Sequence, residues 1–406
     1  MNSFWQSMED NMKLYEIGTG YTPIPAQMGA ATEIVVEGLT RAFQKLNVPV
    51  EIIDIKATGR ADTDLPIQEV WVPACFSGTD VKLGLMHKLK RVVYSLCLTA
   101  KLRGILKNAE EQTVLHFHNQ YNLFFFLKLT PAKLRAKARI AYTVHSYIWP
   151  EEWEKIEETV RKRYFQEIYC VQHADDVLVL NDKTAEHFVQ RLGVAPERIH
   201  KIGNGVDTDA YHVLAQEKVD EFRREQNITG RKVIFQVGSV CDRKNQMGAV
   251  KMLSAYLKDH PDVIYLYAGG VIDEAYQQSI LAFAAQQGIS EQICYAGELC
   301  PGAVLNGYYN AADVTVFPSK VESFGLVIIE SLCAGTPVLL GDKPLFPLQE
   351  GYEIYNSEAE FVQLVDRMLC GDYEKTDVRR EAAENYGWQN TAQTHLQIWQ
   401  GRKTNV

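Results

Sequence analysis

Short apolar segments alternate with helical segments along the whole chain, and this alternation limits the fold more than any other feature. In the first half, strands are predicted at 13–17, 50–55, 69–72, 113–117, 139–144 and 176–180, with a helix at 32–45. In the second half, strands are predicted at 233–237, 263–267, 293–295, 314–317 and 338–340, with a helix at 245–258. This order is typical of parallel sheets with helices on both faces. We therefore expect an α/β protein built on doubly wound sheets.

The alternation restarts near residue 230, after a charged helical segment at 215–226 and a break at 227–230. The restart predicts two Rossmann-like domains, an N-terminal one over 1–210 and a C-terminal one over 211–384. Because ligands bind at the carboxyl ends of parallel strands, two such domains facing each other would form a cleft. The tail at 379–400 has one long helical pattern.

Composition narrows the class of protein. The 406 residues are 46% hydrophobic and 23% charged, as in a soluble globular protein, and the net charge of −9 argues against nucleic acid as the main partner. No apolar run reaches the length of about 18 residues that a membrane span needs, and residues 1–10 lack the pattern of a secretory signal. The eight cysteines form no C-x-x-C pair, which favours free thiols in a reducing cytoplasm. Neither they nor the ten histidines have metal-ligand spacing, so no metal is expected.

The strongest local pattern lies at 318–338, where a buried strand leads through a loop into a helix predicted at 325–334. The backbone N–H groups of Phe324, Gly325 and Leu326 would be first-turn donors at the carboxyl edge of the sheet. A negatively charged group, typically phosphate, fits such a position. The pattern therefore predicts a phosphate site at this junction.

Two carboxylates flank that junction, Glu322 before the helix and Glu330 about two helical turns beyond Glu322. Carboxylates accept hydrogen bonds from hydroxyl groups and do not favour phosphate directly. A phosphate between two hydroxyl-bearing groups is the outline of a sugar nucleotide. The alternative is ordinary, a helix cap at Glu322 and a solvated helix face at Glu330.

A basic pair, Arg243 and Lys244, stands at the start of the helix at 245–258, just after a strand that ends in Gly238. Cations at a helix N-terminus oppose the helix dipole unless an anion binds nearby. We therefore expect Lys244, with Arg243 as a second candidate, to clamp phosphate.

Further candidates lie in the first half. The loop after the first strand carries Gly29 among small residues that let a ligand approach closely, although a plain connecting loop is an equal alternative. His116, His118 and His145 stand at the ends of two predicted strands, where they are either functional or packed and hydrogen-bonded. Asn204 belongs to a segment that by itself indicates only a turn.

Together these motifs resemble the retaining glycosyltransferases of family 4, which have the GT-B architecture. The resemblance runs from the Gly29 loop to Trp388. Its most specific part is the E-x7-E motif from Glu322 to Glu330. The other matching segments are H-x-H at 116–118, T-V-H at 143–145, A-D-x-V at 174–177, N-G-V-D at 204–207, V-G-x5-K-N at 237–245, the lead-in at 308–313 and Y-G-W at 386–388.

The resemblance implies a role for each matching residue. Lys244, with the amides of Gly325 and Leu326, would bind the donor diphosphate, Glu330 the ribose and Glu322 the transferred sugar. The base would lie near Gly297, Glu298 and Leu299, and the donor set would also include Gly238, Ser239, Arg243 and Phe324. Gly29, His116, His118, His145 and Asn204 would lie on the acceptor side, with His145 and the Gly29 loop where donor meets acceptor. Glu322, His145 and Lys244 are thus the catalytic candidates.

The implied activity is hexosyl transfer with retention and without a metal or other cofactor. A hexose or N-acetylhexosamine would move from a UDP- or GDP-sugar to a glycan, lipid-linked or small-molecule acceptor. The helix at about 385–406 would cross back to the N-terminal domain. Two alternatives remain open, a GT-B enzyme with epimerase or synthase chemistry and a catalytically silent partner that binds sugar nucleotides.

Two departures from the family pattern stand out. Ser239 occupies a position where the family usually has Arg, so either Arg243 substitutes or the diphosphate is held differently. The stretch after the strand at 338–340 is shorter and poorer in glycine than is common in the family.

Residues 81–107 carry seven Lys or Arg and no acid, with apolar residues between them. In an acidic protein this patch predicts peripheral contact with anionic lipid on the inner face of the membrane. A solvated helix face, or a site for an anionic soluble acceptor, is the alternative.

Overall fold

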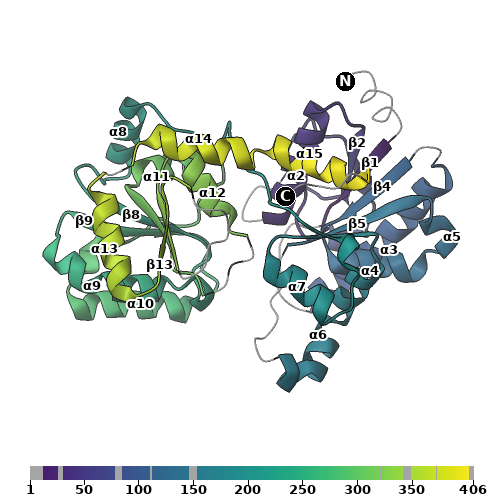
Figure 1. Cartoon of the computed structure of the whole chain (residues 1–406), viewed down its shortest axis with the longest axis horizontal. Helices are drawn as coiled ribbons and strands as arrows, with labels where there is room; N and C mark the ends of the chain where they lie inside the picture. The colour runs from purple at the N-terminus through teal and green to yellow at the C-terminus, as the bar shows by residue number, and fades with distance from the viewer. Residues whose placement is uncertain are drawn as a thin grey trace. The chain divides into compact units, whose positions relative to one another are not determined.

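The computed structural model describes residues 12–25, 31–77, 85–109, 112–145, 153–320, 322, 324–341, 349–371 and 373–401. The chain divides into two compact units (Figure 1). The N-terminal unit comprises Met1–Gly205 and Trp388–Val406, and the C-terminal unit comprises Val206–Gly387.

The N-terminal unit is built on a seven-stranded parallel sheet with the order β3-β2-β1-β4-β5-β6-β7. The expected α/β class with parallel sheets is confirmed. The strands are β1 (Met12–Ile17), β2 (Val50–Ile55), β3 (Ile67–Val70), β4 (Gln112–Phe117), β5 (Ala138–Val144), β6 (Asp176–Val179) and β7 (Ile199–Lys201). The helices are α2 (Ala31–Lys45), α3 (Leu85–Lys107), α4 (Gln120–Leu129), α5 (Ala132–Arg135), α6 (Trp153–His173), α7 (Asp182–Gln190) and α15 (Trp388–Trp399).

Side chains alternate between the two faces of this sheet, as strand geometry requires. On one face, Tyr15 and Ile17 of β1 join the main apolar core with Leu98 of α3 and Phe126 of α4. On the other face, helix α2 packs against α15. Glu16, between Tyr15 and Ile17, therefore projects away from the main core.

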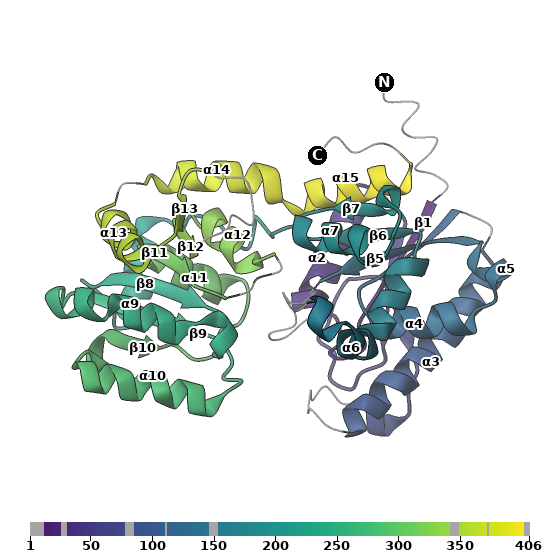
Figure 2. The same ribbon diagram turned by 60° about the horizontal axis from the view of Figure 1, so that its bottom comes forward.

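The C-terminal unit has a six-stranded parallel sheet with the order β10-β9-β8-β11-β12-β13 (Figure 2). Helices α10 and α13 each contact α9, and α11 contacts α8 and α12, which packs on α14. The strands are β8 (Lys232–Val237), β9 (Val263–Ala268), β10 (Ile293–Tyr295), β11 (Val314–Phe317), β12 (Val338–Gly341) and β13 (Tyr352–Tyr355). The helices are α8 (Gln216–Glu225), α9 (Gln246–Asp259), α10 (Glu274–Gln287), α11 (Ala303–Ala311), α12 (Leu326–Cys333), α13 (Glu358–Leu369) and α14 (Lys375–Tyr386).

The tail differs from the single long helix that its pattern predicts. It forms α14 and α15, which are separated by Gly387 in an extended conformation (Figure 1). Gly387 pairs with Val206, whose N–H donates to the carbonyl of Tyr386 at 2.8 Å. The backbone pairing at this point takes the place of a helical turn, so the helix stops there.

Trp388, the first residue of α15, fits against two glycines of the N-terminal unit. A Cβ on Gly38 would lie 2.2 Å from the indole of Trp388, and a Cβ on Gly205 would lie 2.4 Å from it. Only glycine leaves room for the ring at either position. At the other end of α15, Trp399 is buried beside Phe43 of α2.

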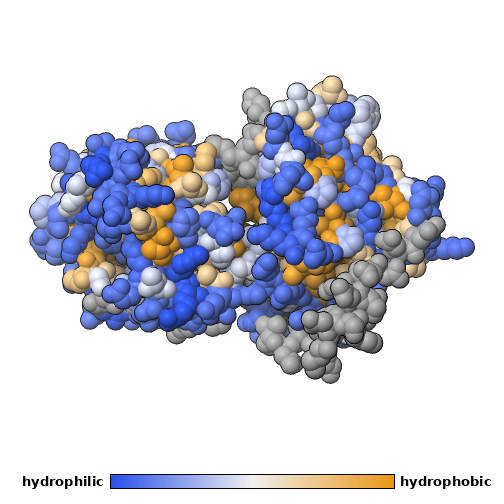
Figure 3. Space-filling view, turned by 90° about the horizontal axis from the view of Figure 1, so that it is seen from above, coloured by the Kyte–Doolittle hydropathy of each residue, from blue (hydrophilic) through white to orange (hydrophobic). Residues whose placement is uncertain are grey.

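Two edge strands, β7 and β13, escaped sequence reasoning. Strands β7 and β13 are three and four residues long and include polar residues, so they lack the apolar run that marks the central strands. The eight cysteines are free thiols in the structure. Figure 3 shows hydrophilic residues over much of one face of each unit, with apolar residues in smaller groups between them.

Candidate functional site

In the C-terminal unit, the loops that follow β8 and β11 are tied together. The side chain of Asn245 donates to the carbonyl of Pro318 at 3.0 Å, and the N–H of Lys320 donates to the carbonyl of Arg243 at 2.9 Å. The ammonium of Lys320 also lies 2.7 Å from a carboxylate oxygen of Asp242. These bonds bring together two of the predicted motifs, which are about 80 residues apart in the sequence.

Lys244 and Glu322 meet at this junction. The Nζ atom of Lys244 lies 2.5 Å from Oε1 of Glu322, and both side chains are largely buried. Nη1 of Arg243 lies 3.7 Å from Oε2 of the same carboxylate. The two cations that were predicted to clamp phosphate therefore lie at Glu322, which was predicted to bind the transferred sugar. Glu322 is thus an ion-pair partner and not only a candidate helix cap.

Gly238 makes room for the Lys244 stem. Its φ is +149°, and a Cβ there would lie 3.2 Å from Cε of Lys244. Gly269, which follows β9, has a φ of +137° and lies so close to Gly238 that a Cβ would meet the Gly238 carbonyl at 2.2 Å. The carbonyl of Ser239, next in the chain, accepts from the buried side chain of Gln246 at 3.1 Å.

The helix that was predicted at 325–334 is α12, which begins at Leu326 with Gly325 as its N-cap. Gly325 has a φ of +78°, a left-handed conformation that favours glycine. The amides of Gly325 and Leu326 therefore stand at the N-terminal end of α12, as predicted, and Phe324 just before them is buried.

Glu330 of α12 is buried rather than on a solvated helix face. The hydroxyl of Tyr309 in α11 donates to Oε2 of Glu330 at 3.0 Å. Burial raises the pKa of Glu330 to about 7, and the hydrogen bonds from Tyr309 and Tyr211 only partly oppose that rise. Sequence reasoning missed both tyrosines, although Tyr309 lies in the lead-in at 308–313.

The segment predicted to contact the base lies at the carboxyl end of β10. The carbonyl of Gly297 accepts from the N–H of Gly269 at 2.8 Å. A Cβ on Gly270 would lie 3.3 Å from the carboxyl carbon of Glu298. Leu299 is half-buried. Since Gly269 also adjoins Gly238, these residues continue the same edge of the sheet as the Lys244 loop.

In the N-terminal unit, His116, His118 and His145 gather around Glu16, which sequence reasoning did not single out. Glu16 of β1 and His116 of β4 are register partners, so their side chains share one face of the sheet. Oε1 of Glu16 lies 3.0 Å from Nδ1 of His116, and Oε2 lies 2.6 Å from Nε2 of His118. Nδ1 of His118 lies 2.8 Å from Nε2 of His145, and the two rings stack.

Burial sets the charges in this cluster. Burial alone raises the pKa of Glu16, but the charges and hydrogen bonds of His116 and His118 outweigh it and hold that pKa far below its ordinary value. Burial and the neighbouring His116 lower the pKa of His118 to about 4, and burial holds the pKa of His145 well below its ordinary value. The cluster thus contains one carboxylate beside neutral imidazoles at His118 and His145.

Glu16, His116 and His118 also have the composition of a metal site, with ligand atoms within 4.8 Å of one another. The sequence did not indicate this set, because Glu16 is about a hundred residues from the histidines. Both ring nitrogens of His116 and of His118 already have hydrogen-bond partners, since Nε2 of His116 lies 2.7 Å from the Thr143 hydroxyl. The donors and acceptors of the set are matched without an ion.

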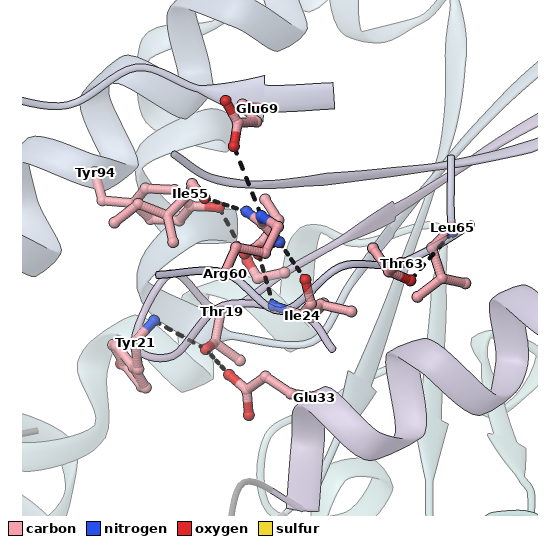
Figure 4. Close-up of polar contacts among 12 residues, drawn as sticks. Thr19, Tyr21, Ile24, Glu33, Ile55, Arg60, Thr63, Leu65, Glu69 and Tyr94 are labelled. Carbon is pink, nitrogen blue, oxygen red and sulfur yellow. Dashed lines mark hydrogen bonds and ion pairs between the residues drawn. The ribbon is translucent and has the colours of Figure 1, made fainter. Parts of the chain in front are cut away.

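The other acceptor-side predictions are placed less fully. Gly29 lies outside the described residues. Asn204 is buried next to Gly205, which contacts Trp388. Near the Gly29 loop, the hydroxyl of Thr19 donates to Glu33 in the first turn of α2, and burial raises the pKa of Glu33 to about 7 (Figure 4).

The segment after β1 is further held by a buried ion pair. Nη1 of Arg60 lies 2.9 Å from Oδ2 of Asp54, and the same oxygen accepts from the N–H of Ile24 at 2.9 Å. Arg60 also donates to the carbonyls of Ile24 and Ile55 (Figure 4). These contacts fix the chain between β1 and the Gly29 loop.

The basic stretch at 81–107 forms helix α3 from Leu85 onward, and not all of its cations face solvent. Lys90 is buried, and the guanidinium of Arg91 lies 4.7 Å from the ring centre of Tyr21 and 4.9 Å from that of Tyr121. Lys90 also donates to the carbonyl of Tyr21, so these two cations pack on the segment after β1 and on the start of α4. Within the described part of the chain, no helix has the length and apolarity needed to cross a membrane.

An apolar row remains on the exposed side of α3. Its members are Met86, Leu89, Val92 and Leu96, spaced as one helix face, with the exposed Lys88 among them.

Two protein families match the chain, one in each half. Residues 32–210 match the family described as Glycosyltransferase Family 4, and residues 218–350 match the family described as Glycosyl transferases group 1.

Individual relatives are distant. The processive diacylglycerol alpha-glucosyltransferase of Acholeplasma laidlawii is 26% identical over 216 residues, which are 52% of this chain and 61% of that protein. A D-inositol 3-phosphate glycosyltransferase of Streptosporangium roseum is 26% identical over 410 residues, which are 95% of this chain and 91% of that one. The crystal structure of Anabaena HepE in complex with UDP and glucose has a TM-score of 0.70 at 14% identity, covering 96% of this chain and 99% of that chain. At this identity the structural likeness concerns the fold.

Proposed function

The chain belongs to the GT-B glycosyltransferases of group 1 and family 4, and from this membership we propose that it transfers a hexose or N-acetylhexosamine with retention of configuration. The donor is a UDP- or GDP-sugar, and the acceptor is a glycan, a lipid-linked sugar or a small molecule. The complex of HepE with UDP and glucose supports the choice of a nucleotide sugar. We place the reaction in the cytoplasm, where the free cysteines stay reduced.

The observation that carries this proposal is the contact of Lys244 and Arg243 with Glu322 beside the N-terminal end of α12. A diphosphate placed there gains the α12 amides and two cations at once. As the bond between sugar and diphosphate breaks, negative charge develops on the leaving group, and the same cations stabilise it. Glu322, released from part of its ion pair, is then placed to accept from hydroxyls of the transferred sugar.

Glu330 supplies the second anchor of the donor. Its carboxylate is oriented by the Tyr309 hydroxyl and stands one helix turn or more beyond the phosphate position. Ionised, it accepts hydrogen bonds from ribose hydroxyls. The segment from Gly297 to Leu299, which adjoins the same edge, is proposed to contact the base. His145, with His116, His118, Asn204 and the Gly29 loop, is proposed to serve the acceptor side.

The test is a pair of substitutions with a matched control. Lys244→Ala removes a charge-assisted hydrogen bond to phosphate and should weaken UDP binding about 10- to 100-fold. Glu322→Gln should lower the transfer rate while leaving UDP binding nearly unchanged, because Glu322 is assigned to the sugar. Lys320→Ala removes an ammonium from the same loops, but one that is paired with Asp242 and not with Glu322, and it should change neither quantity more than about twofold.

Calorimetry with UDP and GDP, and product analysis with a panel of their sugars, give the readouts. Normal turnover in both Lys244→Ala and Glu322→Gln would remove the donor assignment. An epimerised sugar or a sucrose-type product would favour the synthase or epimerase alternative, and tight UDP binding without any turnover would favour a silent partner.

We further propose that the chain touches anionic membranes through α3. The exposed apolar row of Met86, Leu89, Val92 and Leu96, next to Lys88, is the pattern of a helix that lies in a lipid interface. Flotation with vesicles of anionic lipid tests this. Leu89→Glu should abolish flotation, whereas Leu281→Glu, at an exposed leucine of α10, should leave it intact. Equal flotation of all three proteins, or none by the parent chain, would contradict it.

A further inference from the structure

The Glu16 cluster has a fixed arrangement of protons that can be read from its contacts. An ionised carboxylate only accepts hydrogen bonds. Nδ1 of His116, at 3.0 Å from Oε1, and Nε2 of His118, at 2.6 Å from Oε2, must therefore both carry protons. Glu16 stays ionised, because the two histidines hold its pKa far below the ordinary value.

The arrangement continues from His118 to His145. Since burial keeps His118 neutral and its proton is on Nε2, its Nδ1 is a bare acceptor. The atom facing Nδ1 at 2.8 Å is Nε2 of His145, which must then be the donor. His145 is also neutral, so its remaining nitrogen, Nδ1, carries a lone pair and no proton.

A second branch ends inside the protein. Nε2 of His116 lies 2.7 Å from the Thr143 hydroxyl. Beyond His116 lie the rings of His395 and Trp399 of α15, each 5.3 Å from it between ring centres. Burial and the nearby His116 lower the pKa of His395 to about 3, so this ring adds no charge. The branch through His118 is the one that leads to His145.

We propose that Glu16 is a positioning residue, which acts through His118 to hold His145 as the Nε2–H tautomer with Nδ1 turned into an acceptor. This inference rests on the proposed function, in which His145 serves the transfer site. In that site His145 accepts a hydrogen bond from a substrate hydroxyl and does not donate one. The stacked His118 ring, 5.1 Å away between centres, fixes the plane of the imidazole.

A metal at Glu16, His116 and His118 is the rival explanation of the same cluster. An ion there would have to replace the protons on Nδ1 of His116 and Nε2 of His118. The two short contacts to Glu16 are those of N–H donors with a carboxylate, and both histidines are fully paired without an ion. The geometry therefore favours the hydrogen-bonded arrangement.

Histidine nitrogen NMR on the full-length chain tests the arrangement without any need for activity. Long-range proton–nitrogen spectra distinguish the two neutral tautomers and the charged form of each histidine. The parent chain should show His118 and His145 as Nε2–H tautomers at neutral pH, with a proton on Nδ1 of His116. A protonated Nδ1 on His145, or a charged His145, overturns the proposal.

Substitutions then test the role of Glu16 in transfer. Glu16→Gln should leave His145 as a mixture of tautomers and lower kcat about 10- to 100-fold, the usual effect of losing such a partner, with UDP binding unchanged. Glu167→Gln is the matched control, because Glu167 is also a buried carboxylate of this unit, bonded to Tyr142 at 2.7 Å on the other face of the sheet. It should alter neither the His145 signals nor kcat.

The outcomes separate this inference from the proposed function. An unchanged His145 tautomer or an unchanged kcat in Glu16→Gln overturns the positioning role, as does one equivalent of tightly bound metal that Glu16→Gln loses. If the parent chain transfers no sugar at all, the proposed function fails instead, and the positioning role in transfer falls with it while the tautomers are still read from the spectrum. Should Glu16→Gln fail to fold, the parent spectrum and Glu16→Asp, expected to retain the tautomer in part, decide the matter.

Discussion

Replacing Glu330 with glutamine should stabilise the protein at alkaline pH while damaging donor binding. Burial raises the pKa of this carboxyl from 4.5 to about 7 in the folded chain. Between these two values the unfolded chain has released the proton and the folded chain still holds it, so the contribution of Glu330 to stability is present at low pH and is lost as pH rises through 7.

The size of the effect follows from the two pKa values. Between pH 5 and pH 7 the folded and unfolded states differ by nearly one proton, at about 1.4 kcal/mol for each pH unit, so Glu330 costs about 3 kcal/mol of stability by pH 8.5. Glutamine does not titrate. The free energy of unfolding of Glu330→Gln minus that of the parent should therefore be about 3 kcal/mol larger at pH 8.5 than at pH 5.

Urea unfolding of the full chain at both pH values measures this difference, and UDP titration measures binding. Glu291→Gln, at an exposed carboxylate of the same unit, is the control and should stay within about 0.5 kcal/mol at both pH values. An equal change in the free energy of unfolding of Glu330→Gln at pH 5 and at pH 8.5 would refute the inference that burial raises the pKa of Glu330. Improved stability with normal UDP binding would instead refute the ribose role of Glu330.

Two further predictions concern steric room and phosphate binding. Gly38→Ala should destabilise the chain by about 1–3 kcal/mol in urea unfolding, because the new Cβ would press on Trp388. Gly104→Ala in α3, where a Cβ has open space, should stabilise the chain by about 0.5–1 kcal/mol. Equal effects of the two substitutions would contradict the packing of Trp388. If Arg243 replaces the arginine that the family has at position 239, Arg243→Ala should weaken UDP binding about tenfold, and adding Ser239→Arg should restore it. Normal UDP binding by Arg243→Ala in calorimetry would contradict this role of Arg243.

Local signals explain what could be predicted for the C-terminal unit. Runs of apolar residues predicted the central strands. Gly325 and the basic pair Arg243 and Lys244 predicted the two loops, because the backbone freedom of glycine and the charge of the pair are visible in a few neighbouring residues. The contact of Lys244 with Glu322 follows from that placement, because parallel strands deliver their following loops to one edge of the sheet.

What escaped prediction depends on register between distant strands. Nothing around Glu16 distinguishes it from any polar residue in a strand, and its partnership with His116 arises only when β1 and β4 pair in one register. A shift of a single residue would turn Glu16 to the other face. Likewise, the orientation of Glu330 depends on Tyr309 in the neighbouring helix α11, which no spacing within either motif reveals.

The placement of α15 has a consequence for synthesis on the ribosome. Trp388 and Trp399 pack in a unit whose sheet lies entirely before position 206, so this unit lacks α15 until residues 388–399 emerge. At about 5–20 residues per second, translation of the intervening segment takes roughly ten to forty seconds. Throughout that delay Phe43, His116 and Gly38 lack the tryptophans that they contact in the folded unit, so this surface stays exposed in the nascent chain.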